Sequence, residues 1–339
     1  MMKRNLQYDV MRVVAIFLVV LQHTWSIPHL DTPEYGLLCY MYGALVSCGV
    51  PLFIMVSGAL NLRPSVTDAG TFLRKRLVRV FVPFLIWATI IYVLTFFTGG
   101  YAEIHTWQDA LCSYLPYLAT NRINASHWFI HLLLVLYLLT PVLRSAFAAG
   151  EARKTAGYIL VVVFALALLA ALYPEMYLLR YTSDLLVYIG LYVAGYYLSL
   201  VELPRQTSIM VGSIGFVVIY AANVLMHRPA YLLITISAAA LFIALQGVDC
   251  SRCERSGEPL VSTLSRYSYC IYLMHVPFVR AFYILQQRYM PYEQQWINWL
   301  LPVLVAIVTL GLCAALVWCA EKLVGRNMLY LGVARRTDN

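Results

Sequence analysis

The chain has 339 residues, of which 62% are hydrophobic and only 12% are charged, and its mean hydropathy is +0.74. This composition excludes an ordinary soluble domain and indicates an all-α integral membrane protein that crosses the bilayer many times. The net charge of +8 does not indicate a nucleic-acid partner, because the basic residues are distributed as expected for one side of a membrane.

About ten transmembrane helices are expected, because ten apolar stretches can each cross about 30 Å of hydrocarbon. The first stretch has no small-residue cleavage site, so it is expected to be retained rather than removed as a signal peptide. We expect one transmembrane domain over residues 1–325 and a short basic tail over residues 326–339. The expected spans are residues 9–28, 37–61, 77–98, 126–147, 157–173, 183–201, 208–226, 229–247, 267–287 and 299–320.

The basic residues predict the orientation. An even number of spans puts both termini on one side, and that side collects 19 of the 24 Lys and Arg residues. The positive-inside rule therefore places both termini in the cytoplasm. The longest polar connection, residues 99–125, then lies on the outer side, and its segment TWQDALCSYLPYL is expected to form an amphipathic helix at the interface.

The first span carries two residues that are costly in lipid, Arg12 and His23. They are eleven positions apart, so their side chains point within ~20° of each other, with His23 ~16 Å further along the axis. This shared face favours a functional site. Alternatively, Arg12 is a snorkelling anchor and His23 is an interfacial residue.

The second and third spans add two features. Pro51, Ser57 and Gly58 weaken the second helix, so they either allow close helix packing or open a break beside a cavity. Arg76 and Arg79 are three apart and are expected to share a helical face. Arg74 and Lys75 lie beside them and complete a basic cluster. This cluster is either a site that binds phosphate groups or an anchor that follows the positive-inside rule.

Histidines mark two later spans. His127 and His131 lie four apart at the start of the fourth span and are expected to line a wet outer cavity rather than to bind a metal, since no third ligand is evident. His275 lies near the middle of the ninth span, where it either serves a site or hydrogen-bonds another helix. Cys250 and Cys253 form a lone CxxC, which is too few ligands for a metal site.

Five segments occur in an order that resembles the acyltransferase 3 family of membrane proteins, the bacterial surface-polysaccharide O-acyltransferases. They reach from residue 8 to about residue 280, and each is a weak signal alone. The chain is similar to the short members that lack an additional soluble domain. The segments are YDVMRVVAIFLVVLQH, VPLFIMVSGAL, FLRKRLVRVFVPFL, HWFIHLLLVLYLLTPVL and YSYCIYLMH.

The resemblance implies transfer of an acyl group, usually acetyl, from acyl-CoA to a sugar hydroxyl, with no permanently bound cofactor. His23 would be the general base or a transient acyl carrier, and Arg12, oriented by Asp9, would bind donor phosphate or offset negative charge. The remaining matching residues would contact the donor (Arg74, Lys75, Arg76, Arg79 and Ser57) or the substrate (His127, Trp128, His131, Tyr137, Tyr272 and His275).

The resemblance further implies a bacterial inner-membrane protein whose acceptor is a glycan or a lipid-linked sugar. The acyl group, the oligomeric state and the identity of the acceptor stay open, since an amino acid or a lipid could replace the glycan. Two other classes of function also fit the residues, namely a transporter of a small acid or acyl group and a membrane partner module without catalysis. No internal repeat is visible, which disfavours the transporter, and a dead site would be expected to have lost Arg12 or His23.

Overall fold

The computed structural model describes residues 5–24, 36–64, 68–148, 151–173, 175, 177–226, 231–250, 260–289 and 297–334. Within these residues the secondary structure is entirely helical. The helices are α1 Leu6–Thr24, α2 Gly36–Val46, α3 Gly49–Asn61, α4 Ala69–Arg76, η2 Leu77–Phe81, α5 Val82–Phe97, α6 Trp107–Ala119, η3 Ala125–His127, α7 Trp128–Ala148, α8 Ala152–Leu172, α9 Tyr177–Ser199, α10 Arg205–Leu225, α11 Tyr231–Gln246, α13 Leu260–Tyr289, α14 Ile297–Val324 and η4 Gly325–Leu331.

Within the described residues, each of the ten expected spans overlaps a helix or a pair of consecutive helices, and residues 25–28 and 229–230 of two spans lie outside the description. In the described residues, eight are long and apolar enough to cross a membrane, and the apolar parts of α9 and α11 are shorter. The helices α2 and α3 contribute to one span, and α4, η2 and α5 form another. The prediction of an all-α, multi-pass membrane protein is therefore confirmed.

Alternate helix ends meet at one end of the bundle, as an up-and-down arrangement requires. The side chain of Gln7, at the start of α1, donates to the carbonyl of Gln246, at the end of α11, at 2.6 Å. Gln246 in turn donates to the carbonyl of Leu198 at 3.1 Å, near the end of α9. Arg205, at the start of α10, donates to the carbonyl of Gly247 at 3.1 Å. These contacts join the ends that the ten-span topology places in the cytoplasm.

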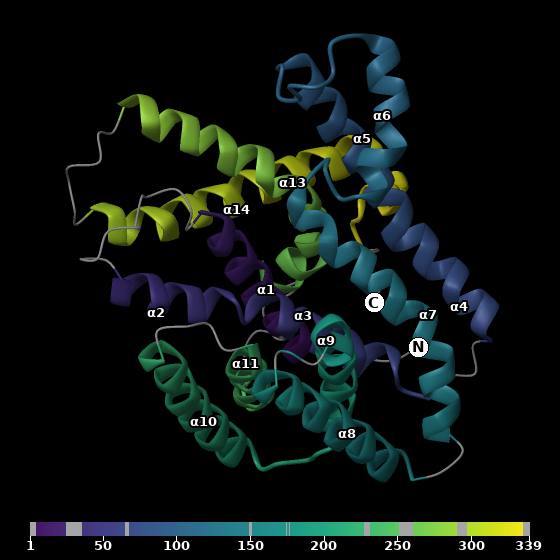
Figure 1. Cartoon of the computed structure of the whole chain (residues 1–339), viewed down its shortest axis with the longest axis vertical. Coiled ribbons are helices and arrows are strands. Elements are labelled where there is room, and N and C mark those ends of the chain that lie inside the picture. Colours follow the sequence, from purple (N-terminus) through teal and green to yellow (C-terminus); the bar gives the residue numbers. More distant parts are fainter. Residues whose placement is uncertain are drawn as a thin grey trace.

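The helices α1 and α3 lie in the middle of the molecule, with α8 to α11 on one side and α5 and α6 on the other (Figure 1). The helix α1 packs against α3, α13 and α14, and α3 packs against α9. Most of α1 is buried by these neighbours. The first span is therefore the centre of the bundle. Its polar residues Asp9 and Thr24 are buried, whereas Arg12 and His23 are partly buried.

Close approach of α3 and α9 depends on two glycines. A Cβ atom at Gly58 would lie 1.7 Å from the carbonyl oxygen of Tyr192, and one at Gly195 would lie 1.9 Å from the carbonyl oxygen of Met55. Of the two readings of the second span, the structure supports close packing, because α3 continues unbroken from Gly49 to Asn61. The interruption of this span lies earlier, between α2 and α3.

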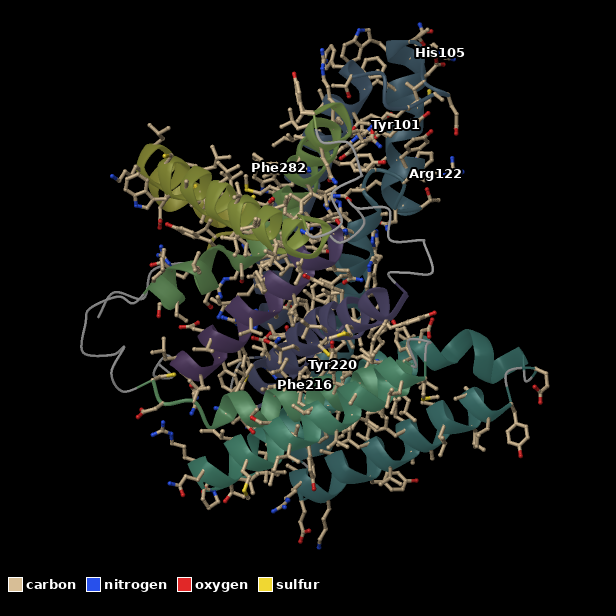
Figure 2. All side chains as sticks on the ribbon, turned by 90° about the vertical axis from the view of Figure 1, so that its left-hand side faces the viewer. Tyr101, His105, Arg122, Phe216, Tyr220 and Phe282 are labelled. Carbon is tan, nitrogen blue, oxygen red and sulfur yellow. The ribbon has the colours of Figure 1, made fainter. Side chains whose placement is uncertain are left out.

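The predicted amphipathic helix is α6. Thr106 caps its first turn reciprocally with Asp109. The protein-facing side buries Tyr117, while Trp107, Leu111 and Leu115 form a stripe of exposed apolar side chains at intervals of four residues. A stripe that faces away from the protein fits a helix lying in the membrane interface. Figure 2 shows this part of the chain, marked by His105 and Arg122, projecting from one end of the bundle.

The residues expected to form a cytoplasmic tail begin with the 3-10 helix η4, which packs on α5 and α14. Trp87 Nε1 donates to the carbonyl of Leu331 at 3.2 Å, and Val333 is buried. Up to Ala334 these residues are therefore part of the folded bundle.

We predict that Gly58→Ala destabilises the protein, because the added methyl group has to push the α9 backbone away from α3. Overpacking of this kind typically costs about 1–3 kcal/mol. Thermal unfolding of the purified protein in detergent measures the effect. The matched control is Gly311→Ala, whose Cβ would meet nothing within 4 Å. Equal melting temperatures for the two variants would contradict the prediction.

Candidate functional site

The C-terminal end of α1 meets the middle of α13 at a pair of histidines. The rings of His23 and His275 have centroids 5.0 Å apart. His23 is half-buried and His275 is fully buried. The sequence separates these residues by 252 positions, so only the packing of α1 on α13 brings them together.

The hydrogen bonds of His275 define its protonation. Its Nδ1 lies 2.7 Å from the carbonyl oxygen of Tyr272. A carbonyl only accepts hydrogen bonds, so Nδ1 carries a proton, and in a neutral imidazole Nε2 then holds a free lone pair. In the described part of the chain, this buried Nε2 has no hydrogen-bond partner. A buried basic lone pair beside His23 is the kind of unsatisfied group that a site retains for its ligand or for proton transfer.

Other predicted residues surround this pair. The ring of Tyr272 lies 5.9 Å from that of His275, and its hydroxyl donates to the carbonyl of Ser126. His127 lies close enough to interact electrostatically with His275. However, it is only 1% exposed and has Asn124 Nδ2 at 3.2 Å, which is unlike the wet cavity lining that we expected. His131 packs with His127 against Phe84.

Arginines converge around Asn61 at the end of α3, at the opposite end of the bundle, which the expected topology places in the cytoplasm. Arg76 donates to Asn61 Oδ1, and Arg144 Nε donates to the Asn61 carbonyl at 2.6 Å. Both guanidinium groups lie over the ring of Phe72, at 5.2 and 4.5 Å. Nearby on α3's end, Arg63 donates to the hydroxyl of Tyr8 at 3.1 Å. We call Arg63, Arg76, Arg144 and Asn61 the arginine cluster.

The arginine cluster holds more positive charge than its neighbours neutralise. Its described contacts are to an amide, a carbonyl, a phenol and aromatic faces, and none is to a carboxylate. The partly buried guanidinium groups of Arg76 and Arg144, which share Asn61 and Phe72 and are held by neutral partners, form a ready site for an anion with several negative oxygens, such as a phosphate group.

The predicted Asp9–Arg12 pair is present at the same end. Arg12 Nη1 lies 4.0 Å from Asp9 Oδ1. Asp9 is only 3% exposed, and it accepts hydrogen bonds from Ser265 at 2.6 Å and from Ser262 at 3.4 Å. Asp9 therefore has a role that the sequence did not reveal: it ties α1 to α13 as well as holding the guanidinium of Arg12.

The basic residues of the third span separate into two groups. Arg76 turns inward to the arginine cluster, whereas Arg74, Lys75 and Arg79 are exposed. The shared face expected for Arg76 and Arg79 is thus not observed. The cause is the π-helix η2, Leu77–Phe81, which follows Arg76 directly and winds more residues into each turn than an α-helix does.

A row of tyrosines joins the two ends. Tyr137 is buried, its ring lies 5.3 Å from the Arg76 guanidinium, and it interacts with Arg12 and with the Ser57 side chain. Tyr269 interacts with Tyr137 and stacks on Tyr272 with centroids 6.5 Å apart. Tyr272 reaches His275. Polar side chains thus run from the arginine cluster to the histidine pair.

Sequence reasoning missed several members of this arrangement, and two of them had a usable signal. Arg144 follows Tyr137 by seven residues, which is two helical turns and hence the same face. Tyr269 precedes Tyr272 by three residues in one helix. By contrast, Asn61 and Arg63 end the second span with no pattern that links them to Arg144.

Two other residues singled out in the sequence are Trp128, which is not part of these clusters, and Cys253. Trp128 is 39% exposed and packs on Tyr188, with ring centroids 5.6 Å apart. Cys253 falls outside the described residues, so the structure says nothing of the CxxC pair. Among the residues that the structure describes, no group of three or more His, Cys, Asp or Glu side chains could hold a metal ion.

Comparison with known proteins identifies the chain's relatives. The family model described as an acyltransferase domain, of the acyltransferase 3 type, matches residues 5–318. That match includes α1, the arginine cluster, the histidine pair and the tyrosine row. No curated protein matches, and no solved structure matches.

We predict that removing the Asp9 carboxylate loosens α1 from α13. Asp9→Ala should lower the melting temperature in detergent more than Ser265→Ala, and Ser262→Ala should have the smallest effect because its bond to Asp9 is long. A hydrogen bond to a charged group typically contributes about 1.5–3 kcal/mol. Unchanged stability of Asp9→Ala would show that this contact does not hold the two helices together.

Proposed function

Since the chain belongs to the acyltransferase 3 family and is a multi-pass membrane acyltransferase, we propose that it transfers an acyl group from cytosolic acyl-CoA, in the simplest case acetyl-CoA. The proposed acceptor is a hydroxyl of a cell-envelope glycan or lipid-linked sugar, and the proposed location is the bacterial inner membrane. The observation that carries this proposal is the pairing of an anion site and a histidine pair at opposite ends of α1, joined by the tyrosine row.

The arginine cluster is the proposed site for the coenzyme phosphates. Acyl-CoA is a cytosolic, polyanionic donor, and the expected topology places this cluster at the cytoplasmic end of the bundle. The guanidinium groups of Arg76 and Arg144 point to the same residue, Asn61, so both can reach one phosphate group. Arg12, held by Asp9 at this end of α1, adds a further positive charge.

The separation of the two ends suits an extended donor. Arg12 and His23 lie ~16 Å apart along α1, so they cannot both touch one reacting atom. A donor whose phosphates bind at the arginine cluster and whose pantetheine arm follows the tyrosine row would present its thioester near His23. The acceptor would then approach from the outer side of the membrane.

The histidine pair supplies proton transfer in this scheme. His23 removes the proton from the acceptor hydroxyl as its oxygen attacks the thioester carbon, so a C–O bond forms and the C–S bond breaks. The proton then passes to the departing thiolate, which leaves as the CoA thiol. The His275 ring, whose buried Nε2 has no hydrogen-bond partner in the described residues, packs beside the His23 ring and would hold it by accepting its N–H. A two-step route through an acyl-histidine uses the same residues.

We predict that Arg76→Gln and Arg144→Gln each raise the KM for acetyl-CoA by about tenfold or more, because each removes a charge-assisted bond worth about 1.5–3 kcal/mol. The matched control is Arg74→Gln, which removes the same charge from an exposed position on α4. The measurement is the rate of CoA-thiol release from acetyl-CoA by protein in nanodiscs. A KM increase that is equal in all three variants would exclude the arginine cluster as a specific phosphate site.

We further predict that His23→Ala lowers kcat for thiol release by about 10²–10⁴-fold, the usual contribution of a general base. His275→Gln should lower kcat with little change in KM, because it removes the partner of His23 rather than a donor contact. His105→Gln is the control, since His105 is exposed near α6, at the far end of the molecule (Figure 2). Full activity of His23→Ala would overturn the proposed role of His23.

A further inference from the structure

An apolar groove lies between α8, α9 and α11, and none of its residues belongs to the arginine cluster, the tyrosine row or the histidine pair. Its volume is about 430 Å³, within the usual range for ligand pockets. The helix α9 forms the floor, because α8 and α11 both pack against it. The groove is lined by Phe164, Ala165, Leu168, Leu191, Ala194, Leu232, Thr235, Ile236 and Ala239.

The groove is open to the surrounding hydrocarbon. Its floor residues Leu191 and Ala194 are buried, whereas Ala165, Leu168 and Ile236 on the walls are exposed. The lining carries no charged side chain, and the hydroxyl of Thr235 already donates to the carbonyl of Tyr231. A dry, uncharged groove inside the bilayer suits a hydrocarbon chain and excludes a polar headgroup.

The position of the groove along the membrane normal follows from the topology. The helix α11 starts at the outer side, and its lining residues, Leu232 to Ala239, fall within about 12 Å of that start. On α8, which starts in the cytoplasm, the lining residues begin twelve positions after Ala152, about 18 Å along the helix. The groove therefore lies in the outer half of the membrane.

Aromatic side chains connect the groove to the histidine pair. Tyr188, one turn before Leu191 on α9, hydrogen-bonds through its hydroxyl to Tyr231, which directly precedes Leu232. The Trp128 ring lies 5.6 Å from Tyr188 and 6.3 Å from its neighbour Phe129. Phe129 lies 5.5 Å from Tyr272, which adjoins His275. Tyr and Trp rings suit groups that are apolar on one side and polar on the other.

From this continuity, and resting on the proposed function, we propose that the groove holds the hydrocarbon chain of a lipid-linked sugar acceptor whose headgroup extends past Tyr188 and Trp128 toward His23. The groove suits the apolar chain of such a molecule, and the rings of Tyr188, Trp128 and Phe129 suit the passage of its polar headgroup. Small side chains at Ala165, Ala194 and Ala239 leave a slot between α8 and α11. An acceptor held in this way arrives in the outer half of the membrane, opposite the donor's cytoplasmic entry.

Photolabelling of the full-length protein in nanodiscs tests the proposal. The probe is a polyprenyl diphosphate-linked monosaccharide with a diazirine on its chain, and the comparison probe is phosphatidylglycerol with a diazirine on one acyl chain. We expect the polyprenyl probe to label residues 164–168, 191–194 or 232–239, and excess unlabelled polyprenyl-linked sugar to compete where phosphatidylglycerol does not. Equal labelling of the groove by both probes would show an ordinary bilayer lipid there and overturn the proposal, as would labelling by the polyprenyl probe only elsewhere.

Variants that fill the groove make the test specific. Ala165→Phe and Ala239→Phe should each reduce polyprenyl labelling at least tenfold, whereas Ala171→Phe, an exposed position on α8 outside the groove, should not. Release of CoA thiol from acetyl-CoA should stay within twofold of wild type in all three. Equal labelling in the groove variants and the control would overturn the proposal. Absence of thiol release in the wild-type protein would instead contradict the proposed function.

Discussion

The arrangement of the whole site depends on one buried carboxylate. Asp9 is almost inaccessible to solvent and is held by two serines of α13, while it also faces the guanidinium of Arg12. A charged group inside a membrane bundle is tolerated only when such partners are provided. This contact fixes the register of α1 against α13. His23 lies about 21 Å from Asp9 along α1, and His275 lies about 15 Å from Ser265 along α13. With the register fixed at Asp9, these two histidines come into contact.

The two ends of α1 lie beside groups of different chemistry, arginines at one end and histidines at the other. The end that the expected topology places in the cytoplasm gathers guanidinium groups around Asn61, with no carboxylate among their described contacts, and the other end holds the packed imidazole rings of His23 and His275. Because α1 runs past both, the proposed acyl donor would bind at one end and react at the other. In the proposed scheme, the apolar groove between α8, α9 and α11 would give the acceptor a separate entry, so that the two substrates would not compete for one opening.

Two local distortions of helices determine which residues join the site. The π-helix after Arg76 turns that residue inward and leaves Arg79 exposed, although an ideal α-helix would place them on one face. At Gly58 and Gly195 the missing side chains let α3 approach α9, which brings Asn61 and Tyr192 into the interior. Both effects arise from packing between helices rather than from the preference of any single residue.

The sequence by itself determined that the chain is an all-α membrane protein and where its apolar helices lie, because hydrophobicity over about 20 residues is enough to specify a span. It also singled out Arg12 and His23, since ionisable residues are rare inside spans. Only the tertiary structure decided what these residues meet. Arg144 meets Asn61, Arg63 meets Tyr8, and His23 meets His275, in each case from helices far apart in the chain. Hydrophobic patterns give the length and face of a helix, but the partners of its polar groups depend on helix–helix register, which is fixed only when all the buried polar groups are satisfied together.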